Sequence, residues 1–300
     1  MPNARPENLM NLSEILPLAE SGSFAIGAFS PRYTALIWPV LEAAQELKSP
    51  VIVQISQSEF DWFNSNPGSF ADEFYRCVSA GDITVPVCLH LDHTRDLAVI
   101  KTAIAEGYSS VMIDASDKSL DENIYLTRRV AAIAHTLGLA VEGELGRIAA
   151  ADQLEGADGV EVFTAPEEAE IFVNRTQVDA LAVSVGTAHG AYTARQPNID
   201  FGRLLAIRAR TAAHLVLHGG SGVPAEMMRQ AYTLPGGGVS KINIGTDLEQ
   251  AAQAALGDSR RVSDLEISSL PPDRLALARA AVKTVVVDKM TNFLDSAGKA

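Results

Sequence analysis

The segment HLDH (90–93) brings two imidazoles and a carboxylate to the end of an apolar run, TVPVCLHL (84–91). His189 and His218 follow apolar runs in the same way, in VGTAHG and VLHGGSG. Together with His93 they make three imidazoles, which is the number of protein ligands at a catalytic zinc ion with an open fourth position. This pattern predicts metal-assisted chemistry, with three separately hydrogen-bonded histidines as the alternative.

The neighbours of His93 suggest different roles for the polar residues around it. Asp92 is a carboxylate beside a potential metal ligand, so it could serve as an acid or base toward a substrate hydroxyl. His90 lies within the apolar run, which favours a buried, structural histidine. His135, in a helical pattern, and His214, before an apolar run, are expected to be structural or exposed.

Two loops contain glycines at positions suited to binding an anion. HGGSGVP (218–224) and NIGTDL (243–248) each follow a predicted strand and lead into a helix. Glycine lets the backbone approach a ligand closely, and the N–H groups at a helix N-terminus attract negative charge. The two loops together predict a phosphate site, whereas GGSG alone would also suit an ordinary turn.

Three further carboxylates lie in or after predicted strands. Glu142 and Glu144 share parity, so both point to one face of their strand. A charged side chain inside a small barrel needs a partner or a metal ion, so at least one of the two is expected to be functional. We expect Asp114 and Glu142 to hydrogen-bond to metal ligands rather than to bind a metal themselves.

These residues fall on a regular series of secondary-structure elements. Predicted strands cover 24–29, 51–56, 84–91, 110–114, 139–145, 180–186, 215–219 and 239–245. Predicted helices cover 34–48, 97–107, 120–138, 166–176, 200–211, 224–232 and 275–297. The first of these helices contains Pro39 and is expected to kink there.

The alternation of strands and helices predicts the fold class. Eight strand and helix units favour a single α/β domain over residues 1–300, a (β/α)8 TIM barrel with an additional C-terminal helix. An open doubly wound sheet is the alternative. In a barrel the C-terminal ends of the strands form the active-site mouth, which would bring the histidines, Asp92 and both glycine loops together.

The composition restricts the possible partners. A formal charge of −13 argues against nucleic acid or an anionic membrane surface, because both need clustered Lys and Arg. No apolar run approaches the roughly 20 residues of a membrane span, and the N-terminal residues do not resemble a signal peptide. We therefore expect a cytoplasmic protein that binds a small molecule. Cys77 and Cys88 fall in a helical and a strand pattern, which predicts core packing rather than a disulfide.

Six motifs, in a fixed order along the chain, resemble those of one enzyme family. They are HLDH (90–93), SSVMIDAS (109–116), VEGELGRI (141–148), AVSVGTAHGAY (182–192), LVLHGGSGVP (215–224) and KINIGTDL (241–248). The chain resembles the class II, zinc-dependent ketose-bisphosphate aldolases, which include the fructose-bisphosphate and tagatose-bisphosphate aldolases. Any one motif is a weak signal, but six of them in register are specific, and the likeness extends over nearly the whole chain.

The resemblance implies reversible cleavage of a ketose phosphate or bisphosphate into dihydroxyacetone phosphate and an aldehyde. His93, His189 and His218 would bind zinc, and Glu144 would serve an alternative metal position. Asp92 matches the family's proton-transfer aspartate. Residues that match the phosphosugar site, often with Na⁺ or K⁺ nearby, are Ser56, Gly190, Gly219, Gly220, Ser221, Asn243, Ile244, Gly245 and Thr246. The resemblance also favours a homodimer or homotetramer.

The chain departs from the family pattern in the loops that would meet the aldehyde. FSPRY (29–33) stands where the family has FNVNN, and SQSE (56–59) stands where it has a serine followed by two glycines. A loop that usually carries GGxED reads AAADQ (149–153), in which Asp152 could take over the proton exchange of the usual glutamate. PPDR (271–274) replaces DPRK in uncertain register, so the arginine for a second phosphate is in doubt. We hypothesise an aldehyde other than simply glyceraldehyde 3-phosphate.

Three other functions are weighed against an aldolase of this type. A metal-dependent hydrolase on a barrel would usually show His-x-His after the first strand, and FAIGAFS (24–30) has none. A Schiff-base aldolase needs a lysine inside the barrel, whereas Lys241 is expected to begin the eighth strand and Lys48 and Lys101 fall in helices. The altered loops leave open a barrel that binds phosphosugar or zinc without turnover.

Overall fold

The computed structural model describes residues 5–148, 162–190, 192 and 196–300. Eight parallel strands close a barrel in the order of the sequence, because β1 pairs with both β2 and β8. The strands are β1 (Ile26–Phe29), β2 (Val51–Ser56), β3 (Val87–Asp92), β4 (Ser110–Ile113), β5 (Ala140–Leu145), β6 (Ala180–Val183), β7 (His214–Leu217) and β8 (Val239–Ile244). The predicted barrel is confirmed, and the open sheet is wrong.

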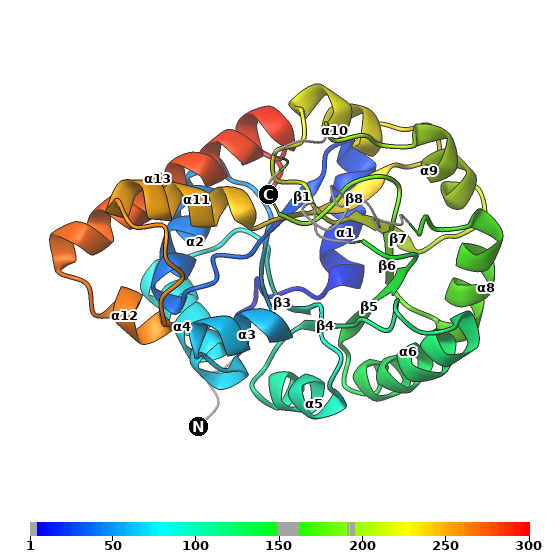
Figure 1. Ribbon diagram of the computed structural model, residues 1–300, viewed down its shortest axis with the longest axis horizontal. Helices are drawn as coiled ribbons and strands as arrows, with labels where there is room; N and C mark the ends of the chain where they lie inside the picture. Colours follow the sequence, from blue (N-terminus) through cyan, green and yellow to red (C-terminus); the bar gives the residue numbers. More distant parts are fainter. Residues whose placement is uncertain (1–4, 149–161, 191, 193–195) are drawn as a thin grey trace.

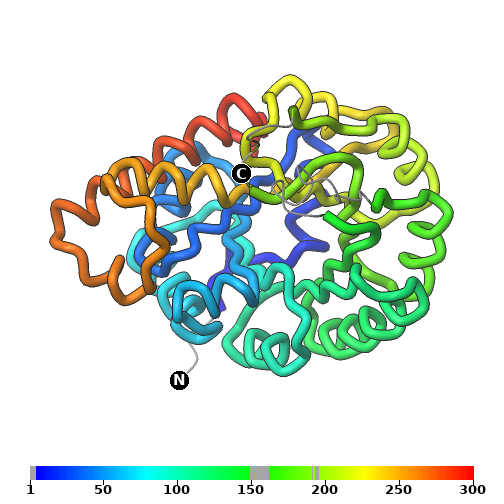
Figure 2. Tube along the Cα trace, in the orientation of Figure 1, coloured from blue at the N-terminus to red at the C-terminus, as the bar shows by residue number. Residues whose placement is uncertain are grey.

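Helices other than α1 surround the strands on the outside of the barrel (Figure 1). The helices are α1 (Leu12–Gly22), α2 (Ile37–Leu47), α3 (Gln57–Phe63), α4 (Pro67–Ala80), α5 (Leu97–Ala105), α6 (Leu120–His135), α8 (Pro166–Thr176), α9 (Phe201–Arg208), α10 (Ala225–Tyr232), α11 (Thr246–Leu256), α12 (Asp264–Ser268) and α13 (Pro272–Asp288). Figure 2 shows the chain passing around the ring in sequence order. Neighbouring units along the chain are therefore neighbours in space.

The predicted helix over 34–48 divides into two parts. A 3₁₀ turn, Thr34–Leu36, precedes α2, and Pro39 lies in the first turn of α2. A proline in the first turn removes no helical hydrogen bond, because the N–H groups there have no partner within the helix. The expected kink at Pro39 is therefore replaced by a change of helix type before Ile37. The additional C-terminal helix is confirmed as α13, which continues as a π-helical turn, Lys289–Phe293.

The N-terminal ends of the strands are closed by α1, which was not predicted. A capping box of Asn11 and Glu14 starts this helix. Its buried face packs on inward-facing strand residues in one apolar cluster, whose members include Leu12, Ile15, Leu16, Ala19, Ile26, Ile52, Cys88, Met112 and Val216. In Figure 1 the helix lies at the centre of the ring. This apolar plug leaves the opposite, C-terminal end of the barrel for polar residues.

The barrel interior becomes polar toward the C-terminal ends of the strands. Gln54 and His90 are paired in the β2–β3 register, and both are almost completely buried. Lys241 is the third residue of β8 rather than its first, and its side chain is fully buried inside the barrel. A register shift between β7 and β8 skips Ser240, and Lys241 shares the inward parity of Asn243. The prediction that Lys241 lies at the start of its strand is therefore wrong.

Two smaller expectations concern cysteines and membrane spans. Cys77 and Cys88 are free and buried, as predicted for core packing. Among the described residues, no helix combines the length and the apolar character that crossing a membrane would require.

Candidate metal centre and substrate pocket

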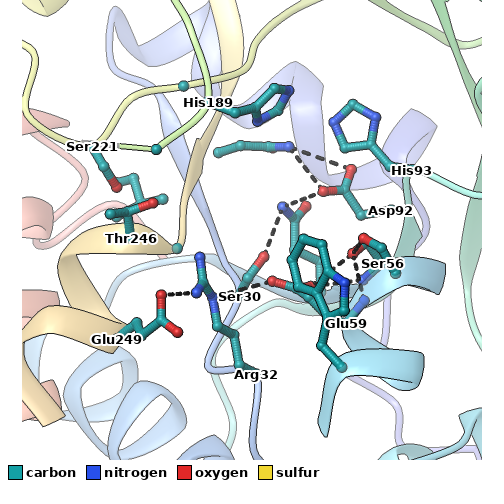
Figure 3. A pocket seen from close by; sticks show the side chains of 18 of the residues that line it. Ser30, Arg32, Ser56, Glu59, Asp92, His93, His189, Ser221, Thr246 and Glu249 are labelled. Atoms are coloured by element: carbon teal, nitrogen blue, oxygen red, sulfur yellow. Dashed lines mark hydrogen bonds and ion pairs between the residues drawn. The ribbon is translucent and has the colours of Figure 1, made fainter. Parts of the chain in front are cut away.

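A cavity of about 1180 Å³ opens at the C-terminal ends of the strands. Asp92 and His93 lie at one side of it, as Figure 3 shows. Ser221, from the loop after β7, and Thr246, at the start of α11, form a second side. Arg32, from the loop after β1, and Glu59, from α3, form a third. The barrel thus brings together residues that are far apart in the sequence, at the end where such enzymes place their active sites.

The three predicted imidazoles converge at this cavity. His93 follows β3, His189 follows β6 and His218 follows β7. One ring nitrogen from each lies within 4.8 Å of the others. The ring centroids of His93 are 4.8 Å from His189 and 4.4 Å from His218. Each side chain can therefore offer one ligand atom to the same cation.

Two of these histidines, His93 and His218, are oriented by carboxylates. In each ring the carboxylate contacts the far nitrogen, which is the one that points away from the other histidine. His93 Nδ1 lies 3.1 Å from Asp114 Oδ2, and His218 Nε2 lies 2.9 Å from Glu142 Oε1. A histidine that donates its far N–H to a carboxylate presents a lone pair on the other nitrogen, as metal-binding histidines do. Asp114 and Glu142 thus hydrogen-bond to the imidazoles, in the arrangement expected from the sequence.

The facing nitrogens of the two histidines test whether the site fits a cation. His93 Nε2 and His218 Nδ1 are only 2.7 Å apart. If both far nitrogens donate, two lone pairs face each other, which is unfavourable unless a proton or a metal ion lies between them. Although burial opposes it, the carboxylates of Asp92 and Asp114 raise the pKa of His93 to about 10. The site therefore attracts positive charge, and its donors suit a divalent metal.

Glu144 supplies a further oxygen beside the imidazoles. Its Oε2 lies 3.7 Å from the Nδ1 atoms of both His93 and His218, and has no hydrogen-bond partner among the described residues. Burial and the neighbouring Asp114 raise the pKa of Glu144 to about 8. A buried oxygen without a partner is costly, so this carboxylate suits a role as an additional metal ligand.

Asp92 is held in place by two amides. Gln54 Nε2 donates to Asp92 Oδ2 at 3.0 Å, and Asn243 Nδ2 donates to the same oxygen at 3.2 Å. Burial opposes ionisation, but the positive charges of His93 and Lys241 hold the pKa of Asp92 well below its usual range. Asp92 is therefore an ionised acceptor at the cavity wall. Sequence reasoning missed Gln54, although it shares the parity of Ser56 in VIVQIS and so had to face inward.

A second group of polar residues lies beneath the cavity. His90 Nδ1 contacts Ser110 Oγ at 2.8 Å, and its fully buried ring is structural, as expected. Lys241 Nζ lies 2.9 Å from Glu142 Oε2 and 4.0 Å from Asp92 Oδ1. Its ammonium group supplies the cation that this buried carboxylate cluster needs. Lys241 does not line the described cavity, so its burial does not make it a Schiff-base nucleophile.

The loops after β6, β7 and β8 form a side of the cavity that we call the glycine wall, which consists of Gly190, Gly219, Ser221, Gly245 and Thr246. Gly219 has a positive φ of 69°, and a Cβ there would lie 2.2 Å from the Ala188 carbonyl oxygen, so only glycine fits. Gly245 is the N-cap residue of α11, and the Asp247 N–H in the first turn donates to Ser221 Oγ at 3.2 Å. Backbone N–H groups at such a helix start are suited to a phosphate.

Three other predicted substrate-binding residues occupy different places. Asn243 and Ile244 line the cavity at the end of β8, and the Ile244 carbonyl accepts the N–H of Ser30. Gly220 lies behind the glycine wall, where its N–H donates to the Asn243 carbonyl at 3.0 Å, and it does not line the cavity. Its place in the fold is thus to join the two loops.

The neighbouring side of the cavity, which we call the ion-pair wall, consists of Arg32, Glu59, Glu249 and Arg261. Arg32 Nε lies 3.3 Å from Glu59 Oε1, and the Arg32 guanidinium also pairs with Glu249. Glu249 in turn accepts Arg261 Nε at 2.8 Å. Ser56 belongs to the base of this wall, because it forms a capping box with Glu59 at the start of α3. In the sequence, Arg32 is notable only because FSPRY differs from the FNVNN of the family, and no pattern indicates that Glu249 belongs to the site.

The remaining candidate residues lie elsewhere. Asp152 and its loop are outside the described residues. Arg274, a candidate for a second phosphate, is exposed on α13 and donates to the Leu256 carbonyl rather than lining the described cavity. His135 pairs with Asp179 and His214 with Glu20, as expected of structural histidines.

A barrel that gathers three imidazoles beside an ionised aspartate can assist cleavage of a carbon–carbon bond next to a carbonyl, which is the chemistry of a metal-dependent aldolase. A family model described as "Fructose-bisphosphate aldolase class-II" matches residues 10–299. The chain therefore belongs to the class II fructose-bisphosphate aldolase family and is an aldolase, a carbon–carbon lyase. The resemblance inferred from the motifs is confirmed.

Individual relatives agree with this membership. The fructose-bisphosphate aldolase of Thermus caldophilus is 37% identical, with 96% of this chain and 98% of that protein covered. That of Geobacillus stearothermophilus is 35% identical, with 98% and 99% covered. Among solved structures, the YdjI aldolase of Escherichia coli K12 superposes with a TM-score of 0.82 at 33% identity, covering 97% of this chain and 99% of the other. The family is generally metal-dependent, and its substrates are phosphosugars.

Proposed function

We propose that the protein is a zinc-dependent aldolase that reversibly cleaves a ketose phosphate into dihydroxyacetone phosphate and an aldehyde. The observation that carries the proposal is the group of His93, His189 and His218 beside the ionised Asp92. The three imidazoles would hold the zinc, with Glu144 as an alternative ligand. Bound there, zinc would act as a Lewis acid toward the negative charge that develops on substrate oxygens as the C3–C4 bond breaks.

The proton at the C4 hydroxyl is assigned to Asp92. Its carboxylate is ionised and is held at a fixed position by Gln54 and Asn243, so it can accept this proton in cleavage and return it in condensation. Asp152 is proposed to exchange the proton at C3 of dihydroxyacetone phosphate. This assignment rests on the alignment of its loop with the family's glutamate.

The phosphate of dihydroxyacetone phosphate is assigned to the glycine wall. Ser221 and Thr246 offer hydroxyl groups, and the start of α11, where the Asp247 N–H donates to Ser221 Oγ, offers the positive end of the helix. A Na⁺ or K⁺ ion beside this phosphate is expected from the resemblance. So is a homodimer or homotetramer, which sedimentation analysis of the purified protein would test.

The test compares metal-free and zinc-loaded protein. With dihydroxyacetone phosphate in deuterated water, proton NMR should show zinc-dependent exchange at C3, and added aldehydes should yield new ketose phosphates. Asp92→Asn should retain zinc by elemental analysis and lose carbon–carbon bond formation. Binding of dihydroxyacetone phosphate without exchange or condensation would support the barrel without turnover, and absence of metal, exchange and condensation would refute the proposal.

A further inference from the structure

The ion-pair wall adjoins the glycine wall at Gly245, where a Cβ would lie 3.8 Å from Arg32 Nη2, and its other end, at Glu59, lies near Ser56 and Asp92 (Figure 3). If the phosphate of dihydroxyacetone phosphate occupies the glycine wall, the carbons beyond the broken bond must extend past Asp92. The Glu59 end of the ion-pair wall is one described surface that they would meet, and Gln57, Ser58 and Arg95 also line the cavity. The chemistry of the ion-pair wall therefore contributes to which aldehydes fit.

The charges of the ion-pair wall are already paired with one another. Arg32 and Glu59 are each 7% exposed and Glu249 is 8% exposed, so the ion pairs among them are poorly screened. Two arginines face two glutamates, so the wall carries no net positive charge, and Asp61 beside it adds a negative one. A phosphate placed here would have to break buried ion pairs and approach two carboxylates, which is strongly unfavourable.

A buried acceptor without a partner points to the kind of group that does fit. Gln54 is 1% exposed and lines the cavity, and its Oε1 has no hydrogen-bond partner among the described residues. The orientation of this amide is fixed, because its Nε2 donates to Asp92, which accepts only. Oε1 can therefore be satisfied only by a donor. A sugar hydroxyl is a donor, whereas a phosphate dianion or a carboxylate is not.

The rest of this side of the cavity offers groups that pair with hydroxyls. Ser30 Oγ accepts from Gln54 Nε2 at 3.3 Å, and Ser56 Oγ and Ser58 Oγ are 3.1 Å apart. Hydroxyl groups both donate and accept, so they can exchange hydrogen bonds with a polyol chain without any change of charge.

We propose that the ion-pair wall binds the carbon chain of an uncharged polyhydroxy aldehyde and rejects aldehyde phosphates. Arg32, neutralised by Glu59 and Glu249, excludes the second phosphate, and Gln54 selects for a hydroxyl next to Asp92. This inference rests on the proposed aldolase function. The natural substrate is then a ketose monophosphate whose phosphate belongs to the dihydroxyacetone half.

The test measures kcat/KM for condensation of dihydroxyacetone phosphate with matched aldehydes by the zinc-loaded, full-length protein. D-glyceraldehyde and D-erythrose are compared with D-glyceraldehyde 3-phosphate and with a sugar uronate that ends in an aldehyde. We expect at least an about tenfold preference for the uncharged aldehydes, because like charges at a poorly screened site oppose binding. A preference for the phosphate or for the uronate would overturn the proposal.

Two variants locate the cause of the preference. Glu59→Gln keeps a side chain that can complete the capping box with Ser56, and Glu249→Gln frees both Arg32 and Arg261 from one carboxylate. Each should lower the preference about fivefold or more in favour of the aldehyde phosphate. The matched control is Glu46→Gln, which removes the same charge at an exposed ion pair with Lys283. An unchanged ratio in both cavity variants would contradict the assignment.

Failure of the inference on the ion-pair wall can be distinguished from failure of the proposed aldolase function. Exchange at C3 of dihydroxyacetone phosphate reports the zinc and glycine-wall half alone, without any aldehyde. Normal exchange with a preference for a charged aldehyde would overturn only the inference on the ion-pair wall. No exchange and no condensation with any aldehyde would overturn the proposed function instead.

Discussion

The glycine wall and the ion-pair wall of the same cavity handle charge in opposite ways. The glycine wall has backbone N–H groups, two hydroxyls and no cationic side chain among Gly190, Gly219, Ser221, Gly245 and Thr246. The ion-pair wall has two arginines, both engaged by carboxylates. The glycine wall, which has no cationic side chain, is assigned the phosphate. The ion-pair wall, which has two arginines, is assigned the uncharged carbon chain of the aldehyde.

This difference shows that available donors, rather than the presence of arginine, indicate an anion site. A guanidinium that already pairs with two buried carboxylates can bind an anion only by breaking those pairs. At the start of α11 the Asp247 N–H donates to the Ser221 hydroxyl, and an anion bound there would not have to separate a buried ion pair. Four predictions test this comparison, beginning with the largest effect.

Removal of an imidazole that is proposed to bind the metal should abolish the C3 exchange of dihydroxyacetone phosphate. His218→Ala leaves two of the three converging rings, so metal affinity should fall by more than about a hundredfold, since even loss of a residue that only orients a ligand costs about 10–100-fold. Elemental analysis and C3 exchange measure this. The comparison variant His135→Ala, on the outer surface, should keep both the bound zinc and the C3 exchange. Retained zinc in His218→Ala would contradict the assignment.

Removal of Arg32 should reveal that the ion-pair wall is structural. Arg32→Met leaves the buried Glu59 without its cation and Glu249 with Arg261 alone, and breaking a buried pair costs about 3–5 kcal/mol of unfolding free energy. Chemical denaturation would measure the loss. Arg76→Met removes an exposed ion pair with Glu73 and should cost less than about 1 kcal/mol. Equal losses in the two variants would break the comparison.

A hydroxyl of the glycine wall should affect binding rather than stability. Ser221→Ala should raise KM for dihydroxyacetone phosphate in C3 exchange about five- to tenfold, as expected for the loss of one hydrogen bond to a charged group. Ser30→Ala, near the ion-pair wall, should leave that KM unchanged and raise KM for the aldehyde. If Ser221→Ala instead raised KM for the aldehyde and Ser30→Ala raised KM for dihydroxyacetone phosphate, the two halves of the substrate would be assigned to the wrong walls.

Zinc binding should release a proton. In the metal-free protein the pKa of His93 is raised to about 10, so its proton is bound at pH 8 and is lost only as the pH rises through that value. A metal ligand must be deprotonated, so zinc affinity should rise with pH below about 10. Calorimetric titration in two buffers of different ionisation enthalpy measures the release, about one proton per zinc at pH 8. A heat that is independent of the buffer would contradict a shared proton between His93 and His218.

Much of the barrel could be predicted because its strands are short apolar runs that end in polar residues. The run predicted at 84–91 is β3 (Val87–Asp92), and placing polar residues at strand ends was enough to bring His93, His189 and His218 together. Parity likewise placed Glu142 and Glu144 inside the barrel. These features depend on local patterns plus one topological rule.

Other features depend on information that local patterns do not contain. Helix α1 has Pro17 in its interior, which obscures a helical pattern, and its position is fixed only by the apolar strand ends it covers. Lys241 shares the parity of Asn243, which lines the cavity, but the register shift between β7 and β8 beside it is marked by no sequence motif. The contact of Arg32 with Glu249 joins residues 217 positions apart. Such contacts follow only once the barrel has closed.

The most direct test of the central claim is competitive cleavage of two substrates that differ only in the second phosphate. Zinc-loaded protein is given fructose 1-phosphate and fructose 1,6-bisphosphate together, and the released glyceraldehyde and glyceraldehyde 3-phosphate are quantified. We predict that glyceraldehyde predominates, because the glycine wall takes the one phosphate and the ion-pair wall excludes the other. Predominance of glyceraldehyde 3-phosphate would show that the ion-pair wall accepts an anion and would contradict the claim.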